Sequence, residues 1–141
     1  MKVEVRVPEL DQILAQGLIV PLAREGTRWE AACLGSRAKD KGVYVIHHDR
    51  KVKYVGKTDG SSMYFGMRLR REFQQTASQG RHIYPKLEAL EVPPDIMVSL
   101  FPLEVIRNCV FVDGVGLTDR GLVAIYEAVL IDAYEPEFQT A

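Results

Sequence analysis

Two tyrosine-containing segments that lie close together in the sequence most constrain the fold of this chain. The first reads Gly42-Val43-Tyr44 and the second reads Tyr54-Val55-Gly56. Residues 42–46 and 51–57 are rich in Val, Ile and Tyr, which favour strands. The polar break between them, at Asp49-Arg50, is short. The pattern predicts an antiparallel hairpin in which each strand carries one tyrosine.

A helix is predicted to follow this hairpin, capped by Ser61 or Ser62 and running to about Thr76. Apolar residues recur every four positions along it, which is typical of a buried stripe; they are Leu69, Phe73 and Ala77. At 100° per residue the opposite face is polar and is expected to point toward solvent or substrate; it carries Arg68, Arg71 and Gln75.

The second half of the chain predicts further helices and strands. A short helix is expected at residues 84–90, before Pro93-Pro94, and strands at 96–100 and 109–112. Thr118 is placed to cap a last helix, with Glu127 on the shoulder of its apolar stripe. That stripe consists of Leu122, Ile125, Tyr126, Val129, Leu130 and Ala133.

The first 41 residues predict a helical leader that packs on the rest of the chain. Pro8 suits the first turn of a helix that Gly17 would end. Thr27-Arg28-Trp29-Glu30 fits a capping box at the start of a second helix. Structural packing is the default explanation for this leader, and contact with DNA or a partner is the alternative. We therefore divide the chain into a leader, 1–41, and a domain, 42–141.

Length and composition limit the class of protein. A chain of 141 residues that is 47% hydrophobic can bury one ordinary core. Residues 1–10 are charged and contain no apolar run, which argues against a signal peptide or membrane span and predicts a cytoplasmic protein. Cys33 and Cys109 are far apart and form no zinc-binding motif. We expect both cysteines to be small core residues.

The net charge of −1 hides a strong segregation of charge along the chain. From Asp49 to Lys86 nine basic residues face three acidic ones, giving +6, whereas residues 87–141 carry −8. The basic segment includes the second tyrosine and the arginine-rich helix, where a polyanion would dock. A solvated basic face is the simpler alternative for this segment taken alone.

The order of these motifs resembles the GIY-YIG nuclease superfamily. The matching blocks are the two tyrosine triplets, Arg68-Leu69 with Phe73, and Glu127 leading into Tyr134, Pro136 and Phe138. The resemblance covers about residues 42–139. It implies an α/β fold with a small, mainly antiparallel central sheet flanked by helices, and metal-dependent endonuclease cleavage of DNA to 5′-phosphate and 3′-hydroxyl ends.

The resemblance also implies roles for individual residues. Tyr44 would activate water and Tyr54 would assist in the hydroxyl network, although buried tyrosines are common in cores and a phenol with a pKa near 10 is a poor base. Arg68 would clamp the phosphate through two parallel hydrogen bonds. Glu127 would bind Mg²⁺ or Mn²⁺, because one carboxylate suits a metal that keeps most of its waters. These four residues are expected to line one concave surface.

Further residues of the basic segment are candidates for binding DNA. Lys57, at the rim of the expected site, would lower the pKa of a tyrosine or bind phosphate, with a solvated surface charge as its alternative. His82 would contact phosphate or relay a proton, though a lone histidine is usually incidental. The expected phosphate contacts are Lys51, Lys53, Arg70, Arg71, Arg81, His82 and Lys86.

Two departures from the family pattern leave a second function open. Gln139 stands where the family usually has Asn, so a hydrogen bond near the metal is expected to change. Ala141 follows without an appended DNA-reading module, as in a minimal nuclease or a piece of a longer protein. The alternative function is a module of the same fold that binds nucleic acid or a protein without cutting.

Overall fold

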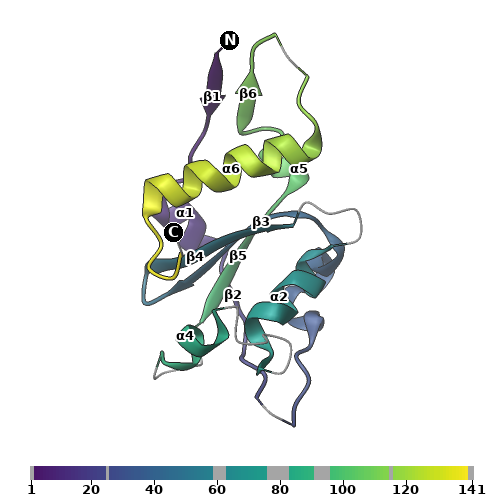
Figure 1. The fold of residues 1–141 in the computed structure, drawn as a ribbon, viewed down its shortest axis with the longest axis vertical. Helices are drawn as coiled ribbons and strands as arrows, with labels where there is room; N and C mark the ends of the chain where they lie inside the picture. Colours follow the sequence, from purple (N-terminus) through teal and green to yellow (C-terminus); the bar gives the residue numbers. More distant parts are fainter. Residues whose placement is uncertain are drawn as a thin grey trace.

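The structure is a computed structural model that describes residues 2–24, 26–58, 63–75, 83–90, 96–114 and 116–139. It is an α/β fold of antiparallel sheets and helices (Figure 1). The elements in order are β1 (Val3–Val5), α1 (Leu10–Ala15), β2 (Leu18–Ile19), the 3₁₀ helix η1 (Ala31–Lys39), β3 (Gly42–His48), β4 (Lys51–Thr58), α2 (Phe65–Phe73), α4 (Tyr84–Glu88), β5 (Met97–Pro102), α5 (Leu103–Ile106), β6 (Val110–Val112) and α6 (Asp119–Tyr134).

A four-stranded antiparallel sheet in the order β2-β5-β3-β4 forms the centre of the molecule. Strands β3 and β4 form the expected hairpin, with Tyr44 opposite Gly56 and Ile46 opposite Tyr54. Asp49 and Arg50 both have positive φ angles, which suits the tight turn of a hairpin. The hairpin prediction is confirmed, and β4 lies at the edge of the sheet.

Close packing explains both glycines of the hairpin. A Cβ on Gly56 would lie 2.3 Å from the hydroxyl oxygen of Tyr44, because the tyrosine ring crosses β4 at this point. A Cβ on Gly42 would lie 2.0 Å from the carbonyl oxygen of Phe101 on β5. These glycines are required by the approach of neighbouring atoms.

Helices cover the two faces of this sheet separately, with α2 on one side and α6 on the other (Figure 1). Tyr44 and Ile46 point to the α2 face and pack with Phe65, Leu69 and Phe73. The alternate residues of β3 point to the α6 face, where they join a second cluster formed by Val43, Val45, Val123, Tyr126 and Leu130.

The leader is only partly helical, which corrects the sequence prediction. Helix α1 forms where expected, but strand β2 completes the central sheet and β1 pairs with β6. The second helix begins at Ala31 and is 3₁₀, and the hydroxyl of Thr27 donates to the carbonyl of Arg24. The proposed capping box is therefore wrong. Strand β2 was missed because two residues carry too little periodicity to identify a strand.

Most elements of the second half form near their predicted positions. Helix α2 has Leu69 and Phe73 buried, but its N-cap is Tyr64; Ser61, Ser62, Thr76 and Ala77 lie outside the described residues. Helix α4, strand β5 and strand β6 confirm the expected segments, whereas α5 was not predicted. The hydroxyl of Thr118 accepts from the Gly121 amide, which confirms the cap of α6.

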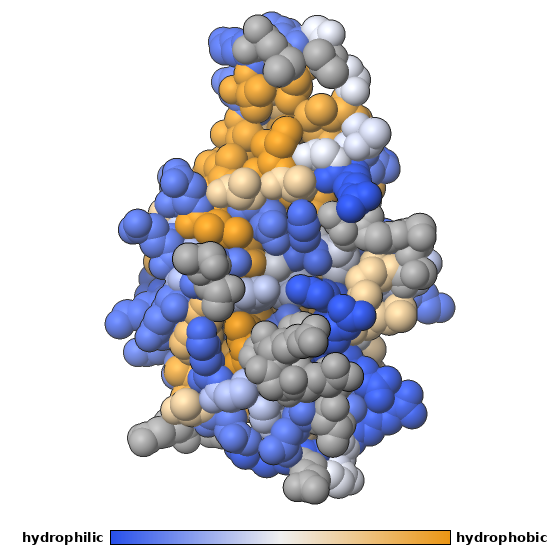
Figure 2. Space-filling model, in the orientation of Figure 1, coloured by the Kyte–Doolittle hydropathy of each residue, from blue (hydrophilic) through white to orange (hydrophobic). Residues whose placement is uncertain are grey.

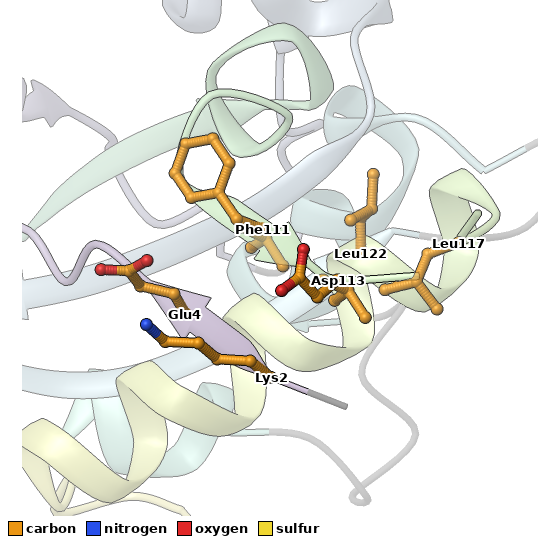
Figure 3. Close-up of a pocket in the computed structure, with 8 residues that line it drawn as sticks. Lys2, Glu4, Phe111, Asp113, Leu117 and Leu122 are labelled. Atoms are coloured by element: carbon orange, nitrogen blue, oxygen red, sulfur yellow. The ribbon is translucent and has the colours of Figure 1, made fainter. Parts of the chain in front are cut away.

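Strands β1 and β6 form a separate two-stranded sheet that projects from the body (Figure 1). Apolar surface gathers over this end of the molecule, and hydrophilic surface over much of the rest (Figure 2). A hollow beside the two strands, of about 500 Å³, includes Phe111, Leu117 and Leu122 together with charges of both signs (Figure 3). None of the predicted catalytic residues lines this hollow.

Both cysteines are free and half-buried, so they are less enclosed than expected. Among the described residues, no helix has the length and apolar character needed to cross a membrane.

Candidate functional site

Arg68 is the centre of a polar cluster on the α2 face of the sheet. Its Nε donates a hydrogen bond to the hydroxyl of Tyr44 over 3.2 Å. Its Nη2 lies 4.0 Å from Glu72 Oε1, and 24% of the side chain is exposed. The expectation that Arg68 points away from the core is therefore wrong, whereas Arg71 and Gln75 are exposed as predicted. Arg68 flanks the apolar stripe of α2, and its long side chain reaches back over the sheet.

Tyr44 is completely buried beneath this arginine. Burial raises the pKa of its phenol well above 10, and the carboxylate of Glu72 raises it further. The charge of Arg68 acts in the opposite direction without cancelling these effects. The phenol is therefore protonated at neutral pH and donates toward Glu72 Oε1, 3.5 Å away. Water activation by Tyr44 stays a prediction, and it requires an acceptor for this proton.

Tyr54 lies beside Tyr44, with 6.2 Å between the ring centroids, and is only half-buried. Burial is the main cause that raises the pKa of its phenol, followed by the charge of Glu72; Arg68 lowers it through its charge and a hydrogen bond. The two tyrosines thus hold one guanidinium between them. Tyr54 is the more accessible of the two phenols.

Glu72 completes the cluster and was missed by the sequence analysis. The residue is 1% exposed, and its Oε2 accepts from the Ile83 amide over 3.4 Å. A signal was present, because Glu72 lies three residues after Leu69 and seven after Phe65, which places it within the apolar stripe of α2. An acid in that position is unexpected for packing alone.

Glu127 and Lys57 approach the hairpin from the other face. Lys57 is aligned with Val43 and not with Tyr44, and its Nζ lies 3.9 Å from Glu127 Oε1 on α6. The sequence predicted that the four catalytic candidates line one surface. In the structure they lie on two faces of the sheet. Arg68 and Glu127 instead reach edge strand β4 from its two sides. The two groups remain linked, because the charge of Glu127 also raises the pKa of Tyr54.

Gln139 has a structural partner that explains its presence. Its Oε1 accepts from the Val55 amide and its Nε2 donates to the Val55 carbonyl, each over 3.0 Å. The amide of Phe138 also donates to the carbonyl of Lys53. The chain after α6 therefore adds to the outer edge of β4. The oxygen and the nitrogen of the Gln139 side-chain amide both bond the Val55 backbone.

The predicted phosphate contacts divide into two groups. Lys51, Arg70, Arg71 and Lys86 are exposed, as phosphate binding requires. Lys53 is different, because its side chain is 11% exposed and forms an ion pair with Glu137. Its assignment as a phosphate contact stays a prediction, and it requires this ion pair to open. Arg81 and His82 lie outside the described residues.

The donor set limits which metal this site can hold. Among the residues that the structure describes, no group of three or more His, Cys, Asp or Glu side chains is gathered for a metal ion. A half-buried carboxylate such as Glu127 fits a hydrated Mg²⁺ or Mn²⁺, which takes its other oxygens from water and phosphate.

This chain was compared with known proteins in three ways. Searches against protein-family models, curated proteins and solved structures found no match.

Proposed function

We propose that this protein is a metal-dependent endonuclease of the GIY-YIG type that hydrolyses phosphodiester bonds of DNA. The observation that carries the proposal is the placement of Arg68, whose guanidinium is held by the hairpin tyrosines while a quarter of the side chain stays exposed. Such a fixed, always charged donor suits the non-bridging oxygens of a phosphate. The exposed cations of α2 and β4 supply further attraction for a polyanion.

The residues around Arg68 support a hydrolytic step. Arg68 would bind the scissile phosphate and stabilise the charge that develops on it. Tyr44 would accept a proton from the attacking water after passing its own phenolic proton to Glu72, the carboxylate 3.5 Å away. Tyr54, which is half-buried, would orient the water or the phosphate.

The other side of β4 supplies the metal ligand. Glu127 would hold Mg²⁺ or Mn²⁺, and the bound cation would neutralise charge on the leaving oxygen. Lys57 lies beside Glu127 and would stay close to the phosphate when the carboxylate binds the cation. Edge strand β4 is therefore the element along which the scissile bond would lie.

A non-cleaving module on the same fold is the second candidate. Two observations favour it: the pKa of Tyr44 is raised by burial, which disfavours a base, and Glu127 is already paired with Lys57. Such a module would keep the cationic surface and bind nucleic acid or a protein without hydrolysis.

Incubation with supercoiled plasmid separates the two functions. The nuclease is expected to nick or cut the plasmid with Mg²⁺ or Mn²⁺ and to be inactive with chelator. Glu127→Ala should abolish cleavage and leave DNA binding nearly unchanged, because the carboxylate repels phosphate. Asp132→Ala is the matched control, since Asp132 is an exposed acid on the same helix. No cleavage with either metal between about pH 6 and 9 would favour the binding module.

A further inference from the structure

A groove lies between η1 and the beginning of α2. It has a volume of about 780 Å³, which is in the range of small-molecule sites. Trp29, Tyr64 and Met67 contribute its apolar surface, and Arg28, Lys39 and Arg70 line it as well. Arg70 is two residues from Arg68, so the two arginines leave helix α2 on different sides, and the groove and the candidate site share this helix.

Small residues build this groove into the fold. A Cβ on Gly66 would lie 3.1 Å from the carbonyl oxygen of Ala38 and 3.2 Å from the Cβ of Ala31. Helix α2 and η1 therefore touch through their backbones at this point. The larger side chains that line the groove surround this close backbone contact. The groove between them is therefore a consequence of how η1 and α2 pack.

The apolar side chains of the groove are placed for contact with a flat ring. Tyr64 is 37% exposed and Met67 is 52% exposed, although large apolar side chains are usually buried. Trp29 is buried, and its Nε1 has no hydrogen-bond acceptor among the residues that the structure describes. Tyr64 and Met67 are therefore the groove side chains that a ligand would contact first.

The charges around the groove favour an anionic ligand. Three cations, Arg28, Lys39 and Arg70, line it against one acid, Glu30. A fourth cation, Lys41, has its Nζ 5.1 Å from the centroid of the Tyr64 ring. Aromatic rings beside a row of cations are the combination by which proteins bind single-stranded nucleic acid, through base stacking and phosphate contacts.

We propose that this groove binds an unpaired base of a single-stranded DNA segment, with the base against Tyr64 and Met67 and its phosphates beside Arg28, Lys39 and Arg70. A duplex does not fit this role, because its bases are stacked and paired inside the helix. The inference rests on the proposed function, because the single strand would belong to DNA bound beside helix α2, which also carries Arg68.

Trp29 makes the proposal measurable, because it is the single tryptophan of the chain. Its fluorescence is followed with chelator present, so that no cleavage is needed, while a short single-stranded thymidine oligonucleotide is added. We expect saturable quenching. An abasic oligonucleotide and a blunt duplex of the same length should bind at least about fivefold more weakly, because neither offers an unpaired base for stacking.

Two variants test the surface itself. Tyr64→Ala should weaken binding of the single strand about tenfold, and Tyr64 makes no side-chain cap that this change would remove. Met67→Asp should weaken it as well by adding a negative charge at an exposed position. Phe111→Ala, which removes an exposed aromatic on β6, is the control and should leave binding unchanged.

Several outcomes would overturn the proposal. They are equal affinity for the abasic oligonucleotide, the duplex or poly-glutamate, and unchanged binding by both groove variants. Tyr64-dependent quenching without plasmid cleavage would reject the nuclease and keep the groove. Plasmid cleavage without quenching would reject the groove and keep the nuclease.

Discussion

The two faces of the central sheet differ in where their charged side chains lie. On the α6 face, Val43, Val45 and Leu130 form an apolar core, and the pair of Lys57 and Glu127 lies at its edge. On the α2 face, Glu72 is 1% exposed, and with Arg68 it lies directly over buried Tyr44. Both faces belong to the same two strands, so strand propensity does not explain the difference.

The difference supports the proposed position of the functional site. Removing an ion from water costs several kcal/mol even after its partners are counted. A fold that needed only packing would place apolar residues at such positions, as the α6 face does apart from buried His47 and Ser99. Buried ionisable groups with shifted pKa values gather at functional sites. The α2 face therefore carries features that packing does not require.

The largest expected effect comes from removing the cation of the α2 face. Arg68→Ala should lower the cleavage rate about 100-fold to 1000-fold, or about 3 to 4 kcal/mol, as for other donors that stabilise transition-state charge. Single-turnover plasmid cleavage measures it. Arg120→Ala is the control, because Arg120 is an exposed arginine on α6 that is not among the predicted phosphate contacts. If Arg71→Ala or Arg70→Ala is the more damaging change, Arg68 is not the phosphate clamp.

The next largest effect is a loss of stability at acidic pH, caused by His47 on the α6 face of the sheet. His47 is buried, its Nε2 lies 2.9 Å from Ser99 Oγ, and burial lowers its pKa to about 4. Between about pH 6.5 and 4, His47 becomes protonated in the unfolded chain but stays neutral in the folded chain. Stability should therefore fall as the pH falls through this window, by up to about 3 kcal/mol.

Denaturant unfolding of the protein and of His47→Gln over this pH range isolates the histidine. The variant should lose less stability than the parent as the pH falls, because its amide does not titrate. His48→Gln is the control at the neighbouring, less buried position. Parallel pH profiles for parent and His47→Gln would contradict the assignment.

A smaller effect tests the packing of Tyr44. Gly56→Ala would bring a Cβ within 2.3 Å of the Tyr44 hydroxyl, so the ring must shift. Overpacking of this kind costs about 1 to 3 kcal/mol of the free energy of unfolding. Gly116→Ala is the matched control, because among the described residues no atom beyond its chain neighbours lies within 4 Å of its added Cβ. Equal unfolding midpoints for the two variants would show that the Tyr44 ring does not need Gly56.

The smallest effect distinguishes two lysines of β4. Lys51 is exposed, whereas Lys53 is paired with Glu137 and its Nζ lies 5.6 Å from the centroid of the Phe138 ring. Lys51→Ala should reduce the slope of log affinity against log salt by about one. Lys53→Ala should lower stability and leave that slope nearly unchanged. A change of slope for Lys53→Ala alone would reverse the two assignments.

Local chemistry was sufficient for several elements of the fold. The β-branched residues and the short polar break predicted β3 and β4, and Thr118 marked the start of α6, because strand propensity and helix capping depend on residues only a few positions apart. In the site, the sequence singled out both tyrosines and the arginine that contacts them.

Tertiary structure decided how these residues meet. The contact of Arg68 with Tyr44 spans 24 positions and that of Gln139 with Val55 spans 84. Contacts between residues so far apart in the sequence leave no local periodicity or capping motif. The orientation of Arg68 toward the sheet and the burial of Lys53 were therefore not predicted. The approach of Glu127 from the far side of β4 depends on which face α6 covers. Only the packing of helices on both faces of one sheet determines that arrangement.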